Sequence, residues 1–328
     1  MMMARSLKAL PWPADMPDVD AVAASYDHCR KIARAAARNF YYGFRLLPDA
    51  KRDALCALYA FMRGVDDIAD EPGTLDEKTR RLHERRAEMD RALAGGANDD
   101  PVWPALRHTV ETYGIPPRYL HDLISGAEMD LTVASYETFA ELREYCYRVA
   151  GTVGLCCVRV FGFSDPHASE LAEKLGIAFQ LTNILRDIPG DFAMGRVYLP
   201  KEDFRQFHCD PGQLAKGDAS AEIAGLMRFE ADRAWQFYGE GWQLLNLVSE
   251  DSRAALWAMA RIYSGVLEKI EARNFGVAAP ESVRLSTGEK LWILARAHMG
   301  WLGETNALRN RDRDWRRTGG PVGGHSAR

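Results

Sequence analysis

Aspartates spaced four residues apart on two apolar stretches are the side chains of this sequence that point most directly to chemistry. Asp66, Asp67 and Asp70 end the stretch LCALYAFMRGVDDIAD, and Asp66 and Asp70 share one face of the helix that its apolar residues predict. Negative charge at the C-terminal end of a helix opposes the helix dipole, so three acids there are costly. A divalent cation would remove that cost, while a solvated helix end is the plainer alternative.

A second acidic stretch favours the cation. Asp187 and Asp191 repeat the four-residue spacing at the end of LGIAFQLTNILRDIPGD, with Arg186 beside them, just as Arg63 precedes the first group. Two such pairs can face each other across the interior of a helix bundle. Carboxylate oxygens suit Mg²⁺, with Mn²⁺ as a substitute, and guanidinium groups suit diphosphate oxygens. The sequence therefore predicts a site where metal ions and a diphosphate meet in a largely apolar cavity.

The rest of the chain supplies helices that position these groups. Apolar residues recur at helical spacing through most of the sequence, which predicts an all-α fold. We expect an extended arm over residues 1–19, one helical domain over 20–305 and a disordered Gly- and Arg-rich tail over 306–328. The expected helices cover residues 20–43, 49–70, 75–94, 102–113, 117–131, 138–163, 175–191, 219–247, 251–272 and 286–305.

Two groups of residues near the acidic stretches admit two interpretations each. Phe40 and Phe44 belong to an aromatic cluster that either packs in the core or forms a wall whose electron-rich faces stabilise a carbocation. Gly151 and Gly154 weaken the helix that contains them. Their presence fits either the close passage of a long apolar ligand or tight packing against a neighbouring helix.

Two more stretches complete the expected surroundings of the site. The residues after Asp191 are expected to form a loop that returns Arg196 and Tyr198 to the same place. The acids of the helix over residues 117–131 are taken as surface or supporting groups, because buried charge is rare. These acids are Asp122, Glu128 and Asp130.

Bulk composition narrows the function classes. With 47% hydrophobic residues the chain can bury a substantial core, and its net charge of -4 gives no footprint for nucleic acid. The six cysteines lack the spacing of a zinc site and several lie in apolar helical stretches, as in a reduced cytoplasmic protein. The sequence shows neither a signal peptide nor a transmembrane span. We expect a cytoplasmic protein with a peripheral membrane contact for product release, and the sequence indicates no particular oligomeric state.

Three motifs carry a resemblance to a known family. YAFMRGVDDIAD, YCYRVAGTVG and QLTNILRDIPGDFAMGRVYLP, in this order and spacing, resemble the squalene/phytoene synthase family of head-to-head prenyl synthases. The similarity extends from about Tyr26 to about Leu291. The resemblance implies an isoprenoid-synthase helical bundle with a central apolar cavity.

The resemblance also implies roles for individual residues. Asp66 and Asp70, with Asp67 beside them, match the first metal-binding group, and Asp187 and Asp191 match the second. Positions that bind diphosphate or support the metals are matched by Tyr59, Arg63, Asn183 and Arg186, and Arg196 is expected to reach the substrate from the following loop. Positions that line the reaction centre, the prenyl channel and the aromatic wall are matched by Tyr145, Val149, Val153, Phe40 and Phe44, and more distant substrate contacts by Tyr263 and Arg284.

The implied activity is the head-to-head condensation of two prenyl diphosphates. Arg63 and Arg186 would stabilise the departing diphosphate, and Tyr145 or a diphosphate oxygen would accept the proton lost on cyclopropane closure. The motifs lean towards two farnesyl diphosphates, which give presqualene diphosphate and, with NADPH, squalene. The alternative is two geranylgeranyl diphosphates, which give phytoene without a reductant. A catalytically inactive family member that serves as an assembly partner is the alternative of another class.

One departure from the family pattern concerns the second acidic group. The family usually reads DxGED there, whereas this chain has DIPGD, with Gly190 in place of a glutamate. Pro189 lacks a backbone N–H, and proline inside a helix costs about 3 kcal/mol or kinks it. We therefore expect the helix to end near Ile188 and the Asp191 carboxylate to be displaced.

Overall fold

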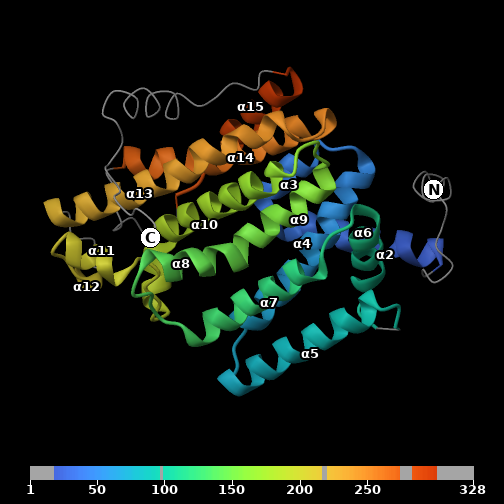
Figure 1. Ribbon diagram of the computed structural model, residues 1–328, viewed down its shortest axis with the longest axis horizontal. Coiled ribbons are helices and arrows are strands. Elements are labelled where there is room, and N and C mark those ends of the chain that lie inside the picture. The colour runs from blue at the N-terminus through green and yellow to red at the C-terminus, as the bar shows by residue number, and fades with distance from the viewer. Residues whose placement is uncertain (1–17, 97–98, 216–219, 274–282, 301–328) are drawn as a thin grey trace.

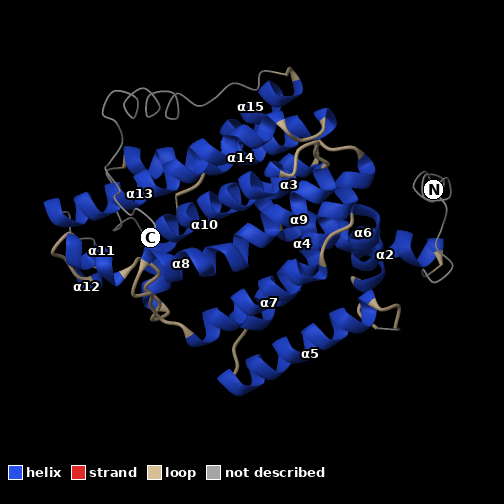
Figure 2. Cartoon of the chain, viewed as in Figure 1, coloured by secondary structure: helices blue, strands red, loops and turns tan. Residues whose placement is uncertain are grey.

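The computed structural model describes residues 18–96, 99–215, 220–273 and 283–300, and Figure 1 shows them as a bundle of helices. Over these residues there is no strand, only two isolated bridges, Ser135 with Val197 and Phe163 with Val248 (Figure 2). The all-α prediction is confirmed. The predicted arm, apart from Asp18 and Val19, and the predicted tail lie outside the described residues.

The helices divide along the chain into two halves. The first half of the bundle consists of α2 (Val19–Ala36), α3 (Arg38–Phe44), α4 (Asp49–Asp70), α5 (Leu75–Leu93), α6 (Trp103–Tyr113), α7 (Pro117–Thr132), α8 (Phe139–Cys146), the π-helical turn η1 (Tyr147–Gly151) and α9 (Thr152–Phe161). The second half consists of α10 (His167–Ala193), α11 (Lys201–Gln206), α12 (Pro211–Ala215), α13 (Ala221–Gly241), the 3-10 turn η2 (Trp242–Asn246), α14 (Glu250–Ala272) and α15 (Thr287–His298).

The two helices that carry the acidic groups lie inside the bundle. α10 packs against α13 and α14 on one side and against α8, η1 and α9 on the other (Figure 1). α4 packs against α2, α6, α7 and α9, with Leu55, Leu58, Phe61 and Val65 fully buried along one face. Burial of that stripe fixes the rotation of α4, and so decides which way the aspartates at its end point.

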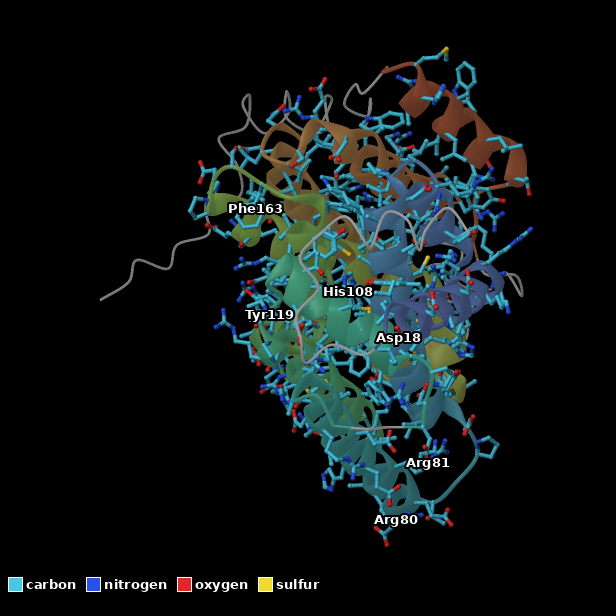
Figure 3. The ribbon with its side chains drawn as sticks, turned by 90° about the vertical axis from the view of Figure 1, so that its right-hand side faces the viewer. Asp18, Arg80, Arg81, His108, Tyr119 and Phe163 are labelled. Atoms are coloured by element: carbon cyan, nitrogen blue, oxygen red, sulfur yellow. The ribbon has the colours of Figure 1, made fainter. Side chains whose placement is uncertain are left out.

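The outer helix α5 is as predicted, a charged helix with a solvated face. Thr74 and Glu77 form a capping box at its start, which satisfies backbone N–H groups of the first turn. Arg80 and Arg81 project from it into solvent in Figure 3, paired with Glu84 and Glu71. Such exposed pairs contribute little to stability, so α5 is held by its buried face, which includes Leu82 and Met89.

The expected helix over residues 138–163 is interrupted by η1, a π-helical turn. A Cβ at Gly154 would lie 2.3 Å from the Ala172 carbonyl oxygen, and one at Gly176 would lie 2.3 Å from the Ala150 oxygen. The glycines therefore serve tight packing of α9 and η1 against α10, one of the two interpretations of Gly154 that the sequence allowed. π-helical turns inserted in α-helices often mark functional sites.

Several helix boundaries differ from expectation: α10 begins at His167 instead of residue 175, α15 ends at His298 instead of residue 305, and the helix expected over 219–247 consists of α13 and η2. The stretch over 20–43 forms two helices that meet at Ala37, and the loop expected after Asp191 contains the short helix α11. All six cysteines are free thiols, in keeping with the prediction. Within the described part of the chain, no helix is both long and apolar enough to span a bilayer.

The prediction that the second acidic helix ends near Ile188 is wrong, because α10 continues through Pro189 to Ala193. Pro189 lies inside the helix, and both it and Gly190 are exposed, so α10 continues past the proline without the hydrogen bond that its nitrogen cannot make. Gly195, with φ of 78°, closes the helix: its N–H bonds the Phe192 carbonyl, and the Arg196 N–H bonds the Asp191 carbonyl at 2.8 Å. This pair of bonds is a Schellman motif. It places Arg196 directly beside Asp191.

Candidate active site

At the acidic end of α4, the Asp66 side chain is accessible to solvent but is also surrounded by many protein atoms. The Asp66 side chain is exposed, but burial raises its pKa to about 7, and the charges of Asp70 and Asp130 add to the rise. The carboxylate therefore reaches solvent although many protein atoms surround it. Asp67 points differently, because it forms an ion pair of 2.5 Å with Arg63 one turn earlier.

The acidic end of α10 shows the same crowding of charge. Burial raises the pKa of Asp191 to about 7, with contributions from Asp187 and Asp130, while Arg196 acts in the opposite direction. Asp187 accepts two hydrogen bonds from Arg186, the one from Nε at 2.8 Å. The carboxylates of α4 and α10 therefore share one electrostatic environment, and Asp130 acts on both.

Asp130, at the end of α7, is the main site residue that sequence reasoning missed. Its carboxylate accepts hydrogen bonds from the hydroxyls of Tyr198 at 2.8 Å and Tyr145 at 3.1 Å. Arg196 donates to its backbone carbonyl at 3.0 Å. Burial raises the pKa of Asp130, and the two tyrosines and Arg196 oppose the rise. Asp130 is half-buried and its charge acts on both Asp66 of α4 and Asp191 of α10. Of the two roles that the sequence allowed, surface or supporting acid, its contacts fit the supporting one.

The sequence held one signal for this role. Asp130 follows the buried residues Leu123 and Ala127 at helical spacing, so it lies on the same face of α7 as they do. Asp122 and Glu128 fit the original interpretation better, since they accept hydrogen bonds from Tyr147 and Arg86 on neighbouring elements.

Aromatic rings from three helices meet next to the acidic groups. Phe40 of α3 lies 5.0 Å from the ring of Tyr263 on α14, and Phe179 of α10 stacks on the same ring at 4.4 Å. Phe44 extends the group, with its ring 6.4 Å from Phe40. Arg186 is among the charges that act on the Tyr263 hydroxyl. The predicted aromatic cluster therefore forms and packs against the core, and Phe179 is a member that the sequence analysis did not select. Its role as a wall for a carbocation stays a prediction.

The remaining predicted residues take up different positions. Tyr59 acts electrostatically on both Arg63 and Tyr263, which links α4 to α14. Val149 and Val153 are half-buried on η1 and α9 and pack against the core. Arg284 is exposed just before α15, and a substrate contact there stays a prediction.

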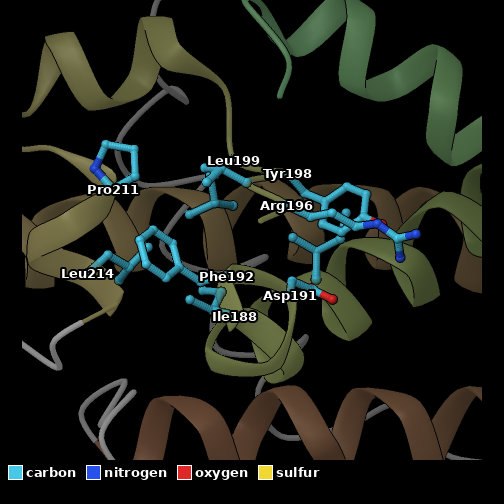
Figure 4. A pocket seen from close by; sticks show the side chains of 10 residues that line it. Ile188, Asp191, Phe192, Arg196, Tyr198, Leu199, Pro211 and Leu214 are labelled. Atoms are coloured by element: carbon cyan, nitrogen blue, oxygen red, sulfur yellow. The ribbon is translucent and has the colours of Figure 1, made fainter. Parts of the chain in front are cut away.

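Two hollows adjoin the acidic ends. One of about 300 Å³ opens over Asp130 and Arg196, between the start of α5, the end of α7 and the turn after α10, and its size is that of a small-ligand site. The other, shown in Figure 4, lies between Arg196, Tyr198 and α12 and has a volume of only about 20 Å³. It holds a water molecule or two rather than a prenyl chain.

The residues present fit a hard divalent cation. The side-chain donors at the two helix ends are oxygens, and the buried Oδ1 of Asn183, one turn before Asp187, has no hydrogen-bond partner. An unpartnered amide oxygen beside carboxylates is a donor set that Mg²⁺ accepts. Among the described residues, no three His, Cys, Asp or Glu side chains are arranged to hold one ion in common. The metal assignment of the five aspartates therefore remains a prediction.

Carboxylates, arginines and aromatic rings that converge inside a helical bundle define an isoprenoid-synthase type of protein. The model of the family "Squalene/phytoene synthase" matches residues 33–289. The chain belongs to this family, whose members are enzymes of the prenyltransferase type that join prenyl diphosphates head to head.

Relatives of known sequence and structure agree with this assignment. The chain is 37% identical to 15-cis-phytoene synthase of Synechocystis, over 81% of this chain and 82% of that protein. It is 38% identical to phytoene synthase of Mycobacterium bovis, over 83% and 90%. A dehydrosqualene synthase matches with a TM-score of 0.78 and 30% identity, over 85% of this chain and 97% of that one. A squalene synthase from Alicyclobacillus acidocaldarius matches with a TM-score of 0.74 and 28% identity, over 80% and 98%.

Proposed function

We propose that this protein condenses two geranylgeranyl diphosphates head to head and releases phytoene. The curated relatives at 37% and 38% identity are phytoene synthases, and they match over most of both chains. This favours the alternative of the sequence analysis over its lean towards farnesyl diphosphate. The second candidate, two farnesyl diphosphates to presqualene diphosphate or squalene, is favoured by the fold matches to a dehydrosqualene and a squalene synthase.

The observation that carries the diphosphate chemistry common to both candidates is the crowding of carboxylates from α4, α7 and α10, with Asp130 acting on both Asp66 and Asp191. Mg²⁺, held by Asp66, Asp70, Asp187 and Asp191 with support from Asn183, would neutralise the diphosphate and make it a better leaving group. Arg196 lies beside Asp191, where its guanidinium can bind diphosphate oxygens in the same place.

Two other arginines, Arg63 and Arg186, would stabilise the diphosphate leaving group. Arg63 and Arg186 each bond a neighbouring aspartate, Asp67 and Asp187, so their guanidinium groups are fixed near the two acidic ends. Fixed positive charge stabilises the diphosphate as its negative charge develops, without the cost of reorienting solvent. The aspartate partners also keep the pKa of both arginines raised against the effect of burial.

The cation left behind needs walls that do not react with it. The rings of Phe40, Phe179 and Tyr263 would supply electron-rich surface, and the charges of Arg186 and Asp187 act on Tyr263. Val149 and Val153 would line the path of the prenyl chain. Water excluded by these apolar groups cannot quench the cation.

Loss of a proton then closes the cyclopropane ring. Burial raises the pKa of Tyr145 strongly, so its phenol is protonated and donates to Asp130. In this arrangement the phenol oxygen accepts the substrate proton while its own proton passes to the Asp130 carboxylate. A diphosphate oxygen is the other acceptor available. Tyr198, bonded to the second Asp130 oxygen, holds that carboxylate in place.

The test is product analysis with defined substrates. Purified protein is incubated with Mg²⁺, or with Mn²⁺ in its place, and either farnesyl or geranylgeranyl diphosphate, with and without NADPH. We expect phytoene from geranylgeranyl diphosphate, in equal amount without NADPH. Squalene that forms only with NADPH would select the second candidate. Turnover of neither substrate would mean an inactive family member. A peripheral membrane contact, which would receive the insoluble product, stays a prediction.

A further inference from the structure

The segment that follows α10 is tied along its length to the end of α7. We call residues 196–203 the strap. Its N–H groups bond backbone carbonyls of the chain that follows α7: Val197 to Ala134 at 2.9 Å and Lys201 to Tyr136 at 3.0 Å. The strap begins with Arg196 and contains Tyr198, both of which bond Asp130. A movement of the strap would therefore change the hydrogen bonds that Arg196 and Tyr198 make to Asp130.

The far end of the strap is held by a buried ionic cluster. Arg233 of α13 donates to Asp203 at 2.8 Å and to Glu230 at 2.7 Å. We call these three residues the Arg233 node. The side chains of Arg233, Asp203 and Glu230 are 13%, 3% and 1% exposed. So much burial of charge in one place, away from the acidic helix ends, calls for an explanation.

Aromatic faces and a further hydrogen bond complete the node. The Arg233 guanidinium lies 4.0 Å from the ring centre of Phe139, at the start of α8, and 4.7 Å from that of Phe229. Glu202 of the strap accepts the Phe139 N–H at 2.6 Å. One guanidinium thus joins α8, α11 and α13. Because α8 also carries Tyr145, the node connects both tyrosines of the Asp130 cluster to one point.

Stability alone is a weak reason for such a node. Desolvation of buried ion pairs largely offsets their attraction, and well-packed apolar residues often do as well. What a forked guanidinium adds is direction, since its donors fix the orientation of the carboxylate they bond. Burial also raises the pKa of Glu230, and the Arg233 guanidinium opposes the rise.

We propose that Arg233 is a positioning residue for the reaction, which holds the strap so that Arg196 and Tyr198 meet Asp130. The inference rests on the proposed function for its catalytic part, while its structural part stands apart from it. A misplacement of about 1 Å at a reacting group costs about 10²-fold in rate. Loss of the node is therefore expected to lower turnover although Arg233 contacts no reacting atom.

The experiment compares Arg233→Met and Arg233→Lys with a matched control, Arg107→Met. Arg107 is a buried arginine of α6, 5% exposed, that pairs with Glu111 at 2.7 Å. For each protein we would measure melting temperature, hydrogen–deuterium exchange of peptides that cover residues 196–203, and kcat and KM. We expect Arg233→Met to speed exchange in the strap by about tenfold and to lower kcat by about 10²-fold with a small change in KM.

The other two variants separate position from stability. Arg233→Lys keeps the charge without the fork, so intermediate exchange and kcat are expected. Arg107→Met should lower the melting temperature while leaving strap exchange and kcat near those of the wild type. Unchanged strap exchange in both Arg233 variants, or a loss of kcat in Arg107→Met equal to theirs, would overturn the proposal. If the wild type turns over no prenyl diphosphate, the proposed function fails, and strap exchange alone decides whether Arg233 holds the strap.

Discussion

The helices α4 and α10 carry their aspartates to the same candidate site, but they end in different ways. α4 ends abruptly after Asp70, where Glu71 turns to an extended conformation and bonds back to the Asp67 carbonyl. α10 runs on past Asp187 and Pro189 and closes with the Schellman motif that starts the strap. The direction of the α4 carboxylates is thus set by one buried helix face. The direction of the Asp191 carboxylate depends also on Gly195 and Arg196, which follow α10 and close its last turn.

This difference separates two kinds of control over one site. The buried residues of α4 fix the position of this helix in the core. Substitution of its aspartates should therefore remove their carboxylates without moving the helix. Around α10 the geometry also depends on contacts far along the chain, from Arg196 to Arg233. Changes in the aspartates should therefore act equally from both helices, whereas changes in the strap or at Arg233 should act through the α10 side.

The largest expected effect comes from the aspartates. Asp66→Ala and Asp187→Ala should each lower turnover by about 10³-fold or more, because each would remove a ligand of the metal that neutralises the leaving group. Helical circular dichroism should stay unchanged in both. Asp76→Ala, in the exposed first turn of α5, is the control and should keep wild-type turnover. Wild-type rates in either site variant would refute the metal assignment.

A smaller effect is expected from Asp130→Asn, which keeps the shape of the side chain and removes its charge. The amide can still bond Tyr198 and Tyr145, but it cannot take up a proton from Tyr145, so turnover should fall by about 10²-fold. Glu128→Gln on the same helix is the matched control, and turnover near that of the wild type is expected there.

Stability should move in the opposite direction in Asp130→Asn. Burial raises the pKa of Asp130 in the folded chain, so its ionised form costs stability as pH rises from the ordinary aspartate range through the raised pKa. The variant lacks this cost. Its melting temperature relative to the wild type should be higher at pH 7 than at pH 4, as thermal unfolding at both pH values would show. A variant that is relatively less stable at pH 7 would contradict a raised pKa.

The features that could be predicted from the sequence are those that residue spacing records. The acidic motifs, the helices that carry them and the aromatic groups at Phe40 and Phe44 are all local patterns of spacing, and the structure places them in one bundle. Asp130 was missed because its role arises only when the strap folds back onto α7, which no local spacing records. Phe179 was missed for the same reason, since its partners lie on α3 and α14.

The error at Pro189 has another physical origin. Proline inside a helix costs about 3 kcal/mol or kinks the helix, but it does not by itself end the helix. Here the proline is exposed near the helix end, and bonds from Gly195 and Arg196 close the last turn beyond it. Local propensity predicted a boundary that tertiary contacts moved, as is common for helix ends.

The smallest expected effect comes from Pro189→Ala and tests how the end of α10 is fixed. Alanine restores a backbone N–H and removes the strain of the ring, so the free energy of unfolding should rise by about 1 kcal/mol. If the strap and the Schellman motif hold Asp191, turnover should stay within about twofold of the wild type. Gly190→Ala is the matched control, because no atom lies within 4 Å of its added Cβ and it improves helix propensity alone. A fall in turnover of tenfold or more in Pro189→Ala but not in Gly190→Ala would show that the proline itself orients Asp191. The direction of the Asp191 carboxylate would then be set by residues of α10 itself, as the direction of the α4 carboxylates is set by residues of α4.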